Sequence, residues 1–419
     1  MTARMAVRPR RLRSSPDRFS GVPQRPTRRQ VTKGLVLAAT GMALRAFAQR
    51  ADRPVRIGYA IARTGPWAAG AQESQEPNYL MWAEQTNAAG GLDVKGTKRT
   101  IELLGVDDQS DIETCTRCYE KLMGGDKVDL ILAPWGSSAT FALAPVANRY
   151  GYPMLAPTAL SRKLVDMNLP FFFSLLQQPD KMMGALLDML AVKGARTVVI
   201  LYMDDLFGFE NLAALNQALK KTSLQVLDRK SYPPGVKDLA PMLRGFKALK
   251  PDAFIGITYP PDTLLASRQS REEGFDPKFF YTSVGTAFQL YRTMMQASAE
   301  GVVGMGSWNA KTSARAKAYF GAYLKRFGKE PDRWASGHCW SGLEILQQAV
   351  ARVGLDRKAL RDQIANHEFD TIIGPIRFAG SENASVPGTV GQWQGSEFEV
   401  VWPPERATAA LIAPKPAWR

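Results

Sequence analysis

The chain has 419 residues, with 54 Lys and Arg, 39 Asp and Glu, and a formal net charge of +15 at pH 7. Residues 1–48 hold eleven Lys or Arg and one Asp, so most of the charge lies in this segment and about +5 remains beyond it. After Arg45 the basic residues are interspersed with acidic ones, which argues against a nucleic-acid-binding protein. No later apolar run reaches the roughly 20 residues that a membrane-spanning helix needs.

The N-terminal segment has the pattern of an export signal. The pair Arg28-Arg29 precedes an apolar run from Gly34 to Leu44, and Ala46-Phe47-Ala48 offers a small-residue cleavage site. This run is too short to span a bilayer, so we expect residues 1–48 to be a cleaved signal and the mature protein to be soluble in the periplasm. The arginine pair resembles a twin-arginine signal. An ordinary secretory signal is the alternative, and Arg45 fits the twin-arginine route better.

The 371 residues beyond the signal are too many for one core and enough for two lobes. Short apolar strands alternate with amphipathic helices, which predicts an α/β fold with parallel sheets covered by helices on both faces. The first unit has predicted strands at Val55–Ala60, Thr100–Val106, Asp129–Ala133 and Tyr152–Ala156, and predicted helices at about Gln72–Ala89, Ile112–Met123 and Ala139–Tyr150.

A second unit repeats this plan, and Gly and Pro residues fall at the predicted joints. Its predicted strands are Phe171–Ser174, Thr197–Tyr202, Gln225–Lys230, Ala253–Thr258 and Phe279–Thr282, and its helices lie near Asp180–Val192, Phe207–Lys220, Leu239–Leu249 and Asp262–Glu273. Two long helices, Ala314–Phe327 and Trp334–Val353, and a strand-and-turn tail around Gly391–Gly395 follow.

The three cysteines do not form a metal-binding pattern. Cys115 and Cys118 lie three residues apart on one face of a predicted helix, together with Leu122. Burial of this face is the favoured interpretation and a local disulfide is the alternative. No second cysteine pair or nearby histidine completes a metal site. We therefore expect no metal and no cofactor, and a buried, unpaired Cys339.

Three loops of the first unit follow predicted strands and carry small or hydroxyl residues. They span Arg63–Gly70, Pro134–Thr140 and Ala156–Ser161. Open parallel sheets bind ligands beyond the carboxyl ends of their strands, where helix N-termini present free N–H groups. Any single serine there is more simply a helix cap, but two such loops at one sheet edge favour a ligand site.

Several short motifs occur in an order that resembles a known family. They are Ile57-Gly58-Tyr59 through Thr64-Gly65-Pro66, Asn87 to Gly91, Asp107 to Ser110, Trp135-Gly136-Ser137-Ser138 and Ala156-Pro157-Thr158-Ala159. The set resembles the leucine/isoleucine/valine-binding family of periplasmic solute-binding proteins of ABC importers, from about Val55 to at least Phe378.

This resemblance implies a type I periplasmic binding protein fold. Two Rossmann-like lobes with parallel central sheets would be joined by three hinge crossovers and would close on a ligand in the cleft between them. We expect the N-terminal lobe to comprise residues 53–171 and 309–365. The C-terminal lobe and tail would comprise residues 172–308 and 366–419.

The resemblance also implies a set of ligand contacts. Ser137 and Ser138, with the backbone from Ala156 through Thr158 and Ala159, correspond to the family's cradle for a ligand carboxylate. The second lobe would close with Phe207, Tyr259 and the loop at Ser283. Trp67 and Trp135 would join these aromatic residues in the pocket wall, although core packing explains any one of them equally well.

The sequence departs from the amino-acid-binding members at one position. Those proteins commonly carry an acidic side chain in the loop that here contains Ser283, and this loop has none. Either Asp204 or Asp205 meets a ligand ammonium group, or the ligand has no ammonium. Helix capping is the simpler role for both aspartates. The partner is then an aromatic or branched carboxylate or an amide, with amino acids as the other option.

Enzyme functions find little support in the sequence. The segment from Trp135 to Thr140 is not a nucleophile elbow, because Thr140 stands where the second glycine of G-x-S-x-G is needed, and neither His338 nor His367 lies near a nucleophile motif. We expect a monomeric, non-enzymatic protein that captures a small solute and presents it to an inner-membrane ABC permease, with no role in nucleic-acid binding. A ligand-sensing co-receptor for a membrane kinase is the alternative.

Overall fold

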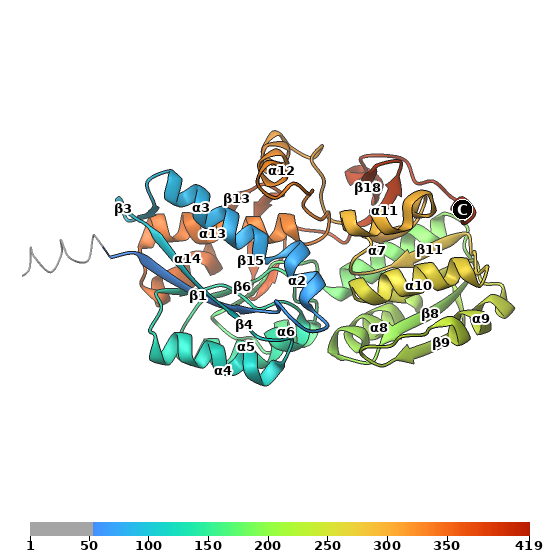
Figure 1. The fold of residues 1–419 in the computed structure, drawn as a ribbon, viewed down its shortest axis with the longest axis horizontal. Coiled ribbons are helices and arrows are strands. Elements are labelled where there is room, and N and C mark those ends of the chain that lie inside the picture. Colours follow the sequence, from blue (N-terminus) through green and yellow to red (C-terminus); the bar gives the residue numbers. More distant parts are fainter. Residues whose placement is uncertain (1–52) are drawn as a thin grey trace, which may run out of the picture. The chain divides into compact units, whose positions relative to one another are not determined.

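The computed structural model describes residues 53–419 (Figure 1). The predicted export signal, residues 1–48, lies outside the described residues. Within the described part the predicted α/β fold is confirmed, because parallel strands alternate with helices in two sets of sheets. No helix between residues 53 and 419 combines the length and the apolar character needed to cross a bilayer.

The first lobe is built around strand β1 (Val55–Ile61). Its side chains are almost all buried, because helices cover both faces of its sheet. β1 lies between β4 (Ile101–Asp107) and β5 (Leu130–Ile131) and is parallel to both. A second group of strands in the order β15-β16-β7-β6 completes the lobe; they are Phe378–Ala379, Glu382–Asn383, Phe172–Ser174 and Met154–Ala156.

The helices of the first lobe form two layers. α4 and α5 contact each other on one side of the strands, and α3 packs against α13 on the other side (Figure 1). The helices of this lobe are α2 (Ala68–Ser74), α3 (Glu76–Ala88), α4 (Ile112–Glu120), α5 (Ser137–Tyr150), α6 (Arg162–Asp166), α13 (Ser336–Val353) and α14 (Arg357–Asn366). A π-helical turn (Lys121–Gly125) extends α4, α12 (Ala314–Phe327) packs on α3, and short hairpins pair β2 (Leu92–Val94) with β3 (Thr97–Arg99) and β13 (Phe369–Thr371) with β14 (Gly374–Ile376).

The second lobe has one seven-stranded sheet in the order β18-β17-β12-β11-β10-β8-β9. β12, β11, β10, β8 and β9 are parallel to one another, whereas β17 is antiparallel to β12 and β18 is antiparallel to β17. The strands are β8 (Thr197–Met203), β9 (Gln225–Tyr232), β10 (Ala253–Ile257), β11 (Phe279–Thr282), β12 (Val303–Met305), β17 (Val390–Gln394) and β18 (Glu397–Trp402). The helices are α7 (Pro179–Val192), α8 (Leu206–Leu219), α9 (Ala240–Leu249), α10 (Pro260–Glu272) and α11 (Gln289–Met295).

The chain passes between the two lobes three times, in residues 175–178, 306–335 and 384–389. Strand pairing places two segments, β7 and β16, in the first lobe and not in the second, where the predicted boundaries had put them. β7, expected to open the second unit, pairs with β6, and β16 pairs with β7. A short strand takes the side of an existing sheet where its N–H and C=O groups find partners. We therefore propose lobe boundaries near residues 175 and 384 in place of 172 and 366.

The helix predicted over Gln72–Ala89 is divided in two. Its first part ends at Ser74 and its second begins at Glu76, because the backbone of Gln75 leaves the helical conformation. Pro77 lies in the first turn of α3, where its missing N–H costs nothing. At this break the side chain of Gln75 lies in the interior of the protein.

Candidate functional site

The loop after β5 leads into α5 with an unusual backbone at Gly136, which has a φ of 88°. This conformation favours glycine and sets Ser137 at the first position of the helix. The Ser137 hydroxyl does not cap α5. It accepts a hydrogen bond from Leu160 N at 2.9 Å and donates one to Leu160 O at 3.2 Å. Ser137 is buried and Ser138 beside it is half-buried.

The loop after β6 is held to the same place by Thr158. Its hydroxyl donates to Gln75 Oε1 at 2.6 Å and accepts from Gly136 N at 3.2 Å. Ala156, the last residue of β6, and Ala159 are both buried. The loops at Ser137 and Thr158, which were predicted to form a carboxylate cradle, therefore lie side by side. The hydroxyl of each residue binds the backbone of the other loop, and the Thr158 hydroxyl also binds Gln75.

Gln75 was not among the expected site residues. Its amide nitrogen donates to Tyr79 Oη and to Ala133 O, both at 2.7 Å, and its oxygen accepts from Thr158. The side chain is fully buried. In the sequence, Pro77 was the signal for a helix start close to Gln75, because proline is favoured in the first turn of a helix.

Trp135 lies against the start of the first helix pair. Its indole N–H donates to Ser74 Oγ at 3.1 Å, and its ring lies so close to Gly70 that a β-carbon there would be 2.2 Å from Trp135 Cζ2. Gly70 is therefore required for the position of Trp135. Trp67 is half-buried in the preceding loop, where its backbone N–H donates to Ser110 Oγ at 3.0 Å.

The second lobe contributes an aromatic pair. Phe207 in the first turn of α8 stacks on Tyr259 with ring centroids 5.0 Å apart. The Tyr259 hydroxyl donates to Asp205 Oδ2 at 2.8 Å, and this bond fixes the ring position. Ser283 is fully buried, and its hydroxyl accepts from Thr258 N and donates to Thr258 O at 2.7 and 2.9 Å.

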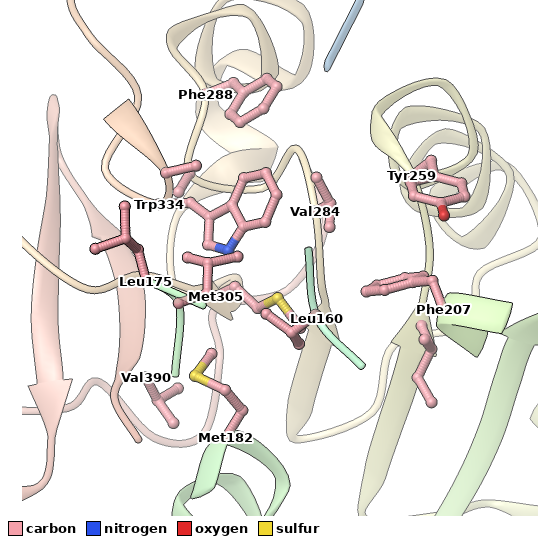
Figure 2. Packing of buried hydrophobic residues seen from close by; sticks show 14 of the residues in the cluster. Leu160, Leu175, Met182, Phe207, Tyr259, Val284, Phe288, Met305, Trp334 and Val390 are labelled. Atoms are coloured by element: carbon pink, nitrogen blue, oxygen red, sulfur yellow. The ribbon is translucent and has the colours of Figure 1, made fainter. Parts of the chain in front are cut away.

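Aromatic side chains from the two lobes meet in the structure. The rings of Trp135 and Tyr259 have centroids 5.6 Å apart. Leu160, Phe207 and Tyr259 belong to one buried cluster with Trp334, which lies in the second segment between the lobes (Figure 2). Trp334 was not among the expected site residues. Its indole N–H has no hydrogen-bond partner among residues 53–419, so it is an unused donor in this cluster.

The two aspartates considered for an ammonium contact differ. Asp205 caps α8, since its side chain accepts from Gly208 N at 2.9 Å, as expected of a helix cap. Burial raises the pKa of Asp205, and the hydrogen bonds from Gly208 and Tyr259 oppose that shift. Asp204 is exposed and lies one residue before the cap position. The prediction that Asp204 also caps α8 is therefore wrong.

The remaining candidate groups are the three cysteines and His338. Between residues 53 and 419, no three His, Cys, Asp or Glu side chains are placed to hold a metal ion. Cys115 and Cys339 are buried free thiols, and Cys118 is a half-buried one. Burial lowers the pKa of His338 to about 4, so its ring is neutral at pH 7.

Comparison with known proteins gives the class of this molecule. Residues 54–397 match the family described as periplasmic binding protein, and the chain belongs to that family. Among curated proteins it is similar to Leu/Ile/Val-binding protein homolog 7 of Brucella abortus (strain 2308), with 22% identity over 406 residues, covering 91% of this chain and 99% of the relative. It is also 22% identical over 410 residues to Leu/Ile/Val-binding protein homolog 8 of Brucella suis biovar 1 (strain 1330), with the same coverage of both chains.

Solved structures share the fold. One is the branched-chain amino acid transporter substrate binding protein of Streptococcus pneumoniae in complex with isoleucine, with a TM-score of 0.73 and 19% identity, covering 86% of this chain and all of that one. Another is a solute-binding protein of an ABC transporter from R. palustris in complex with benzoate, with a TM-score of 0.74 and 17% identity, covering 87% and 98% of the two chains. The expected two-lobed periplasmic binding protein fold is thereby confirmed.

Proposed function

We propose that this protein is the solute-binding component of an ABC importer. It is exported to the periplasm, binds a small molecule between its lobes, and delivers the molecule to a permease in the inner membrane. The observation that carries this proposal is the meeting of the Ser137 and Thr158 loops of one lobe with Phe207 and Tyr259 of the other, in a chain of the periplasmic binding protein family. Hydrogen-bonding groups on one side and aromatic rings on the other suit a small ligand with a polar end and an apolar body.

We propose that the lobes open to admit the ligand. Trp135 of the first lobe contacts Tyr259 of the second, so the space between these residues is filled by side chains. A ligand must take the place of that contact, and movement of the lobes about the three connecting segments provides the way in. Ser137, Ser138, Ala156, Thr158 and Ala159 would then hold the polar end, and Trp67, Trp135, Phe207, Tyr259 and Ser283 would surround the remainder.

The ligand that fits best is a carboxylate or amide without an ammonium group. Three acidic side chains near the second-lobe half of the site already have partners: Asp205 binds Tyr259, Asp262 binds Tyr232, and Glu210 binds Ser161. An ammonium group would have to share one of these carboxylates with the protein donor already bound to it. Structural relatives bind both kinds of molecule, isoleucine in one case and benzoate or 3,4-dihydroxybenzoic acid in others.

A matched pair of ligands tests this proposal. Leucine and 4-methylpentanoate share one branched skeleton and differ in the ammonium group, and phenylalanine and 3-phenylpropanoate form the corresponding aromatic pair. Mature protein, unfolded and refolded to remove carried-over ligand, is screened with both pairs by thermal shift and then by calorimetry. A ligand at about 100 times its dissociation constant stabilises the folded state by about 2.7 kcal/mol. We expect the ammonium-free members to bind more tightly; tighter binding of both amino acids would contradict this ligand class, and absence of binding by any small carboxylate, amide or amino acid would contradict the function.

A further inference from the structure

The short helix α6 begins without a cap from its own sequence. Ser161 occupies the N-cap position, but its side chain makes no hydrogen bond to the first turn. The first-turn N–H of Lys163 instead donates to Glu210 Oε2 at 3.1 Å, and the Ser161 hydroxyl donates to the same oxygen at 3.3 Å. Glu210 belongs to α8 in the second lobe, so the carboxylate that caps this first-lobe helix comes from the opposite lobe.

Glu210 depends on these contacts as much as α6 does. Its side chain is only 9% exposed, and its other oxygen lies 3.5 Å from the Lys163 ammonium. All its side-chain hydrogen bonds and ion pairs within residues 53–419 go to Ser161 and Lys163 of the first lobe. A buried carboxylate is costly unless donors surround it, so Glu210 is satisfied here only while the lobes are together.

These contacts adjoin the candidate ligand loops directly. Ser161 follows Leu160, whose N–H and C=O both bind the Ser137 hydroxyl. Glu210 lies one helical turn after Phe207, the ring that stacks on Tyr259. A shift of the loop that contains Leu160 and Ser161 therefore reaches both Ser137 and Glu210.

We propose that Glu210 is a positioning residue that caps α6 only when the lobes close, and that it thereby couples closure to the loop that receives the ligand. This inference rests on the proposed function. When the lobes separate, the Lys163 N–H and the Glu210 carboxylate each turn to water. When they close, the helix start gains a charged acceptor, and such hydrogen bonds are stronger than neutral ones.

The test replaces Glu210 by glutamine, which keeps the size of the side chain and removes its charge. The control is Glu405→Gln, the same change at an exposed glutamate of the C-terminal segment. Affinity for the tightest ligand of the screen is measured by calorimetry, and hydrogen exchange of the Lys163 amide is measured with and without that ligand. We expect Glu210→Gln to weaken binding about ten-fold, since the hydrogen bonds from Ser161 and Lys163 lose their charged acceptor, and Glu405→Gln to leave it unchanged.

Hydrogen exchange separates positioning from a general loss of stability. In the wild-type protein, ligand should slow exchange of the Lys163 amide, and in Glu210→Gln this slowing should be smaller, because the acceptor is no longer charged, while amides in β1 exchange as before. Lys163→Gln, which keeps the backbone donor, should weaken binding no more than about two-fold because the ammonium is mostly exposed. Equal ligand protection of Lys163 in the wild-type and Glu210→Gln proteins would overturn the inference and leave the proposed function standing. Absence of any ligand for the wild-type protein would overturn both.

Discussion

Ser137 in the first lobe and Ser283 in the second make the same pair of hydrogen bonds. Each hydroxyl bridges the N–H and the C=O of one residue in a neighbouring loop, Leu160 in the first case and Thr258 in the second. Each serine also follows a strand of a parallel sheet. In both lobes, a serine hydroxyl therefore joins two loops at the edge of a sheet through the same pair of hydrogen bonds.

The surroundings of the two serines differ. Ser137 starts a fourteen-residue helix and lies beside Trp135, in loops rich in small residues. Ser283 binds Thr258, the residue before Tyr259, and two acids of that region, Asp205 and Asp262, accept from tyrosine hydroxyls. The same pair of serine hydrogen bonds therefore lies within a hydrogen-bonding surface in the first lobe and supports an aromatic surface in the second.

The largest effect is expected at Gln75, which holds the polar half together. In Gln75→Leu, the hydroxyls of Thr158 and Tyr79 and the carbonyl of Ala133 lose their amide partner inside the protein. Tyr79 Oη and Ala133 O keep their bond to each other at 3.1 Å, whereas the Thr158 hydroxyl is left without an acceptor and Pro134 O without the amide donor. Each buried group left without a partner costs about 1–3 kcal/mol, so we expect a loss of about 3 kcal/mol in the free energy of unfolding and loss of ligand binding. Urea unfolding and calorimetry measure the two quantities. Gln72→Leu, a nearby change at a half-buried residue, is the control, and equal losses in both variants would contradict the role of Gln75.

A pH-dependent effect is expected in the second lobe, where Asp262 lies behind the aromatic pair. Burial raises the pKa of Asp262 to about 6, although hydrogen bonds from Tyr232 and from the Tyr259 backbone oppose the shift. The folded state therefore holds this proton more tightly than the unfolded chain. The contribution of Asp262 to stability falls as the pH rises from about 4 to about 6 and is constant above that window.

Asp262→Asn removes this dependence. The difference in free energy of unfolding between variant and wild type should shift by about 2–3 kcal/mol in favour of the variant between pH 4 and pH 7. Contributions of other groups, including His338, cancel in this difference. Urea unfolding at several pH values measures it. A difference that stays constant with pH would show that Asp262 is ionised in the folded state throughout the window.

Most strands and helices of the two parallel sheets could be predicted from the sequence, because periodicity and Gly or Pro joints are local signals. The short elements β12, α6 and α11 were missed, and so was the helix α14. The pairing of β7 with β6 and the Gln75 contacts were missed because they depend on which segments meet in space. Ser161 illustrates the limit. A serine before a short helix predicts a cap, but its hydroxyl binds Glu210, 49 residues away. The site loops were recognisable from their small residues, whereas Trp334 was not, since its position arises from the path of the chain between the lobes.

Comparing Ser137→Ala with Ser283→Ala tests the two lobes directly. Each variant loses one bridging hydroxyl, so each should reduce the free energy of unfolding by about 1–2 kcal/mol. Only Ser137→Ala is expected to weaken ligand binding as well, by about 1–3 kcal/mol, because its loop receives the polar end of the ligand. Calorimetry at equal fractions of folded protein measures the affinity. Equal losses of affinity in the two variants would remove the distinction between a polar first lobe and an aromatic second lobe.

The smallest effects are expected at the adjacent pair Asp204 and Asp205. Asp205→Asn keeps an oxygen acceptor for Gly208 N but replaces the oxygen that accepts from Tyr259 Oη by an NH2 group, so we expect a loss of about 0.5–1 kcal/mol in stability and a similar loss in affinity through the Tyr259 ring. Asp204→Asn, at an exposed site, should change neither by more than about 0.5 kcal/mol. The sharper readout is the ratio of affinities for 4-methylpentanoate and leucine. If neither aspartate meets an ammonium group, both substitutions leave that ratio unchanged; a selective loss of leucine binding in either variant would place a ligand ammonium beside that carboxylate and would give the second lobe a charged contact.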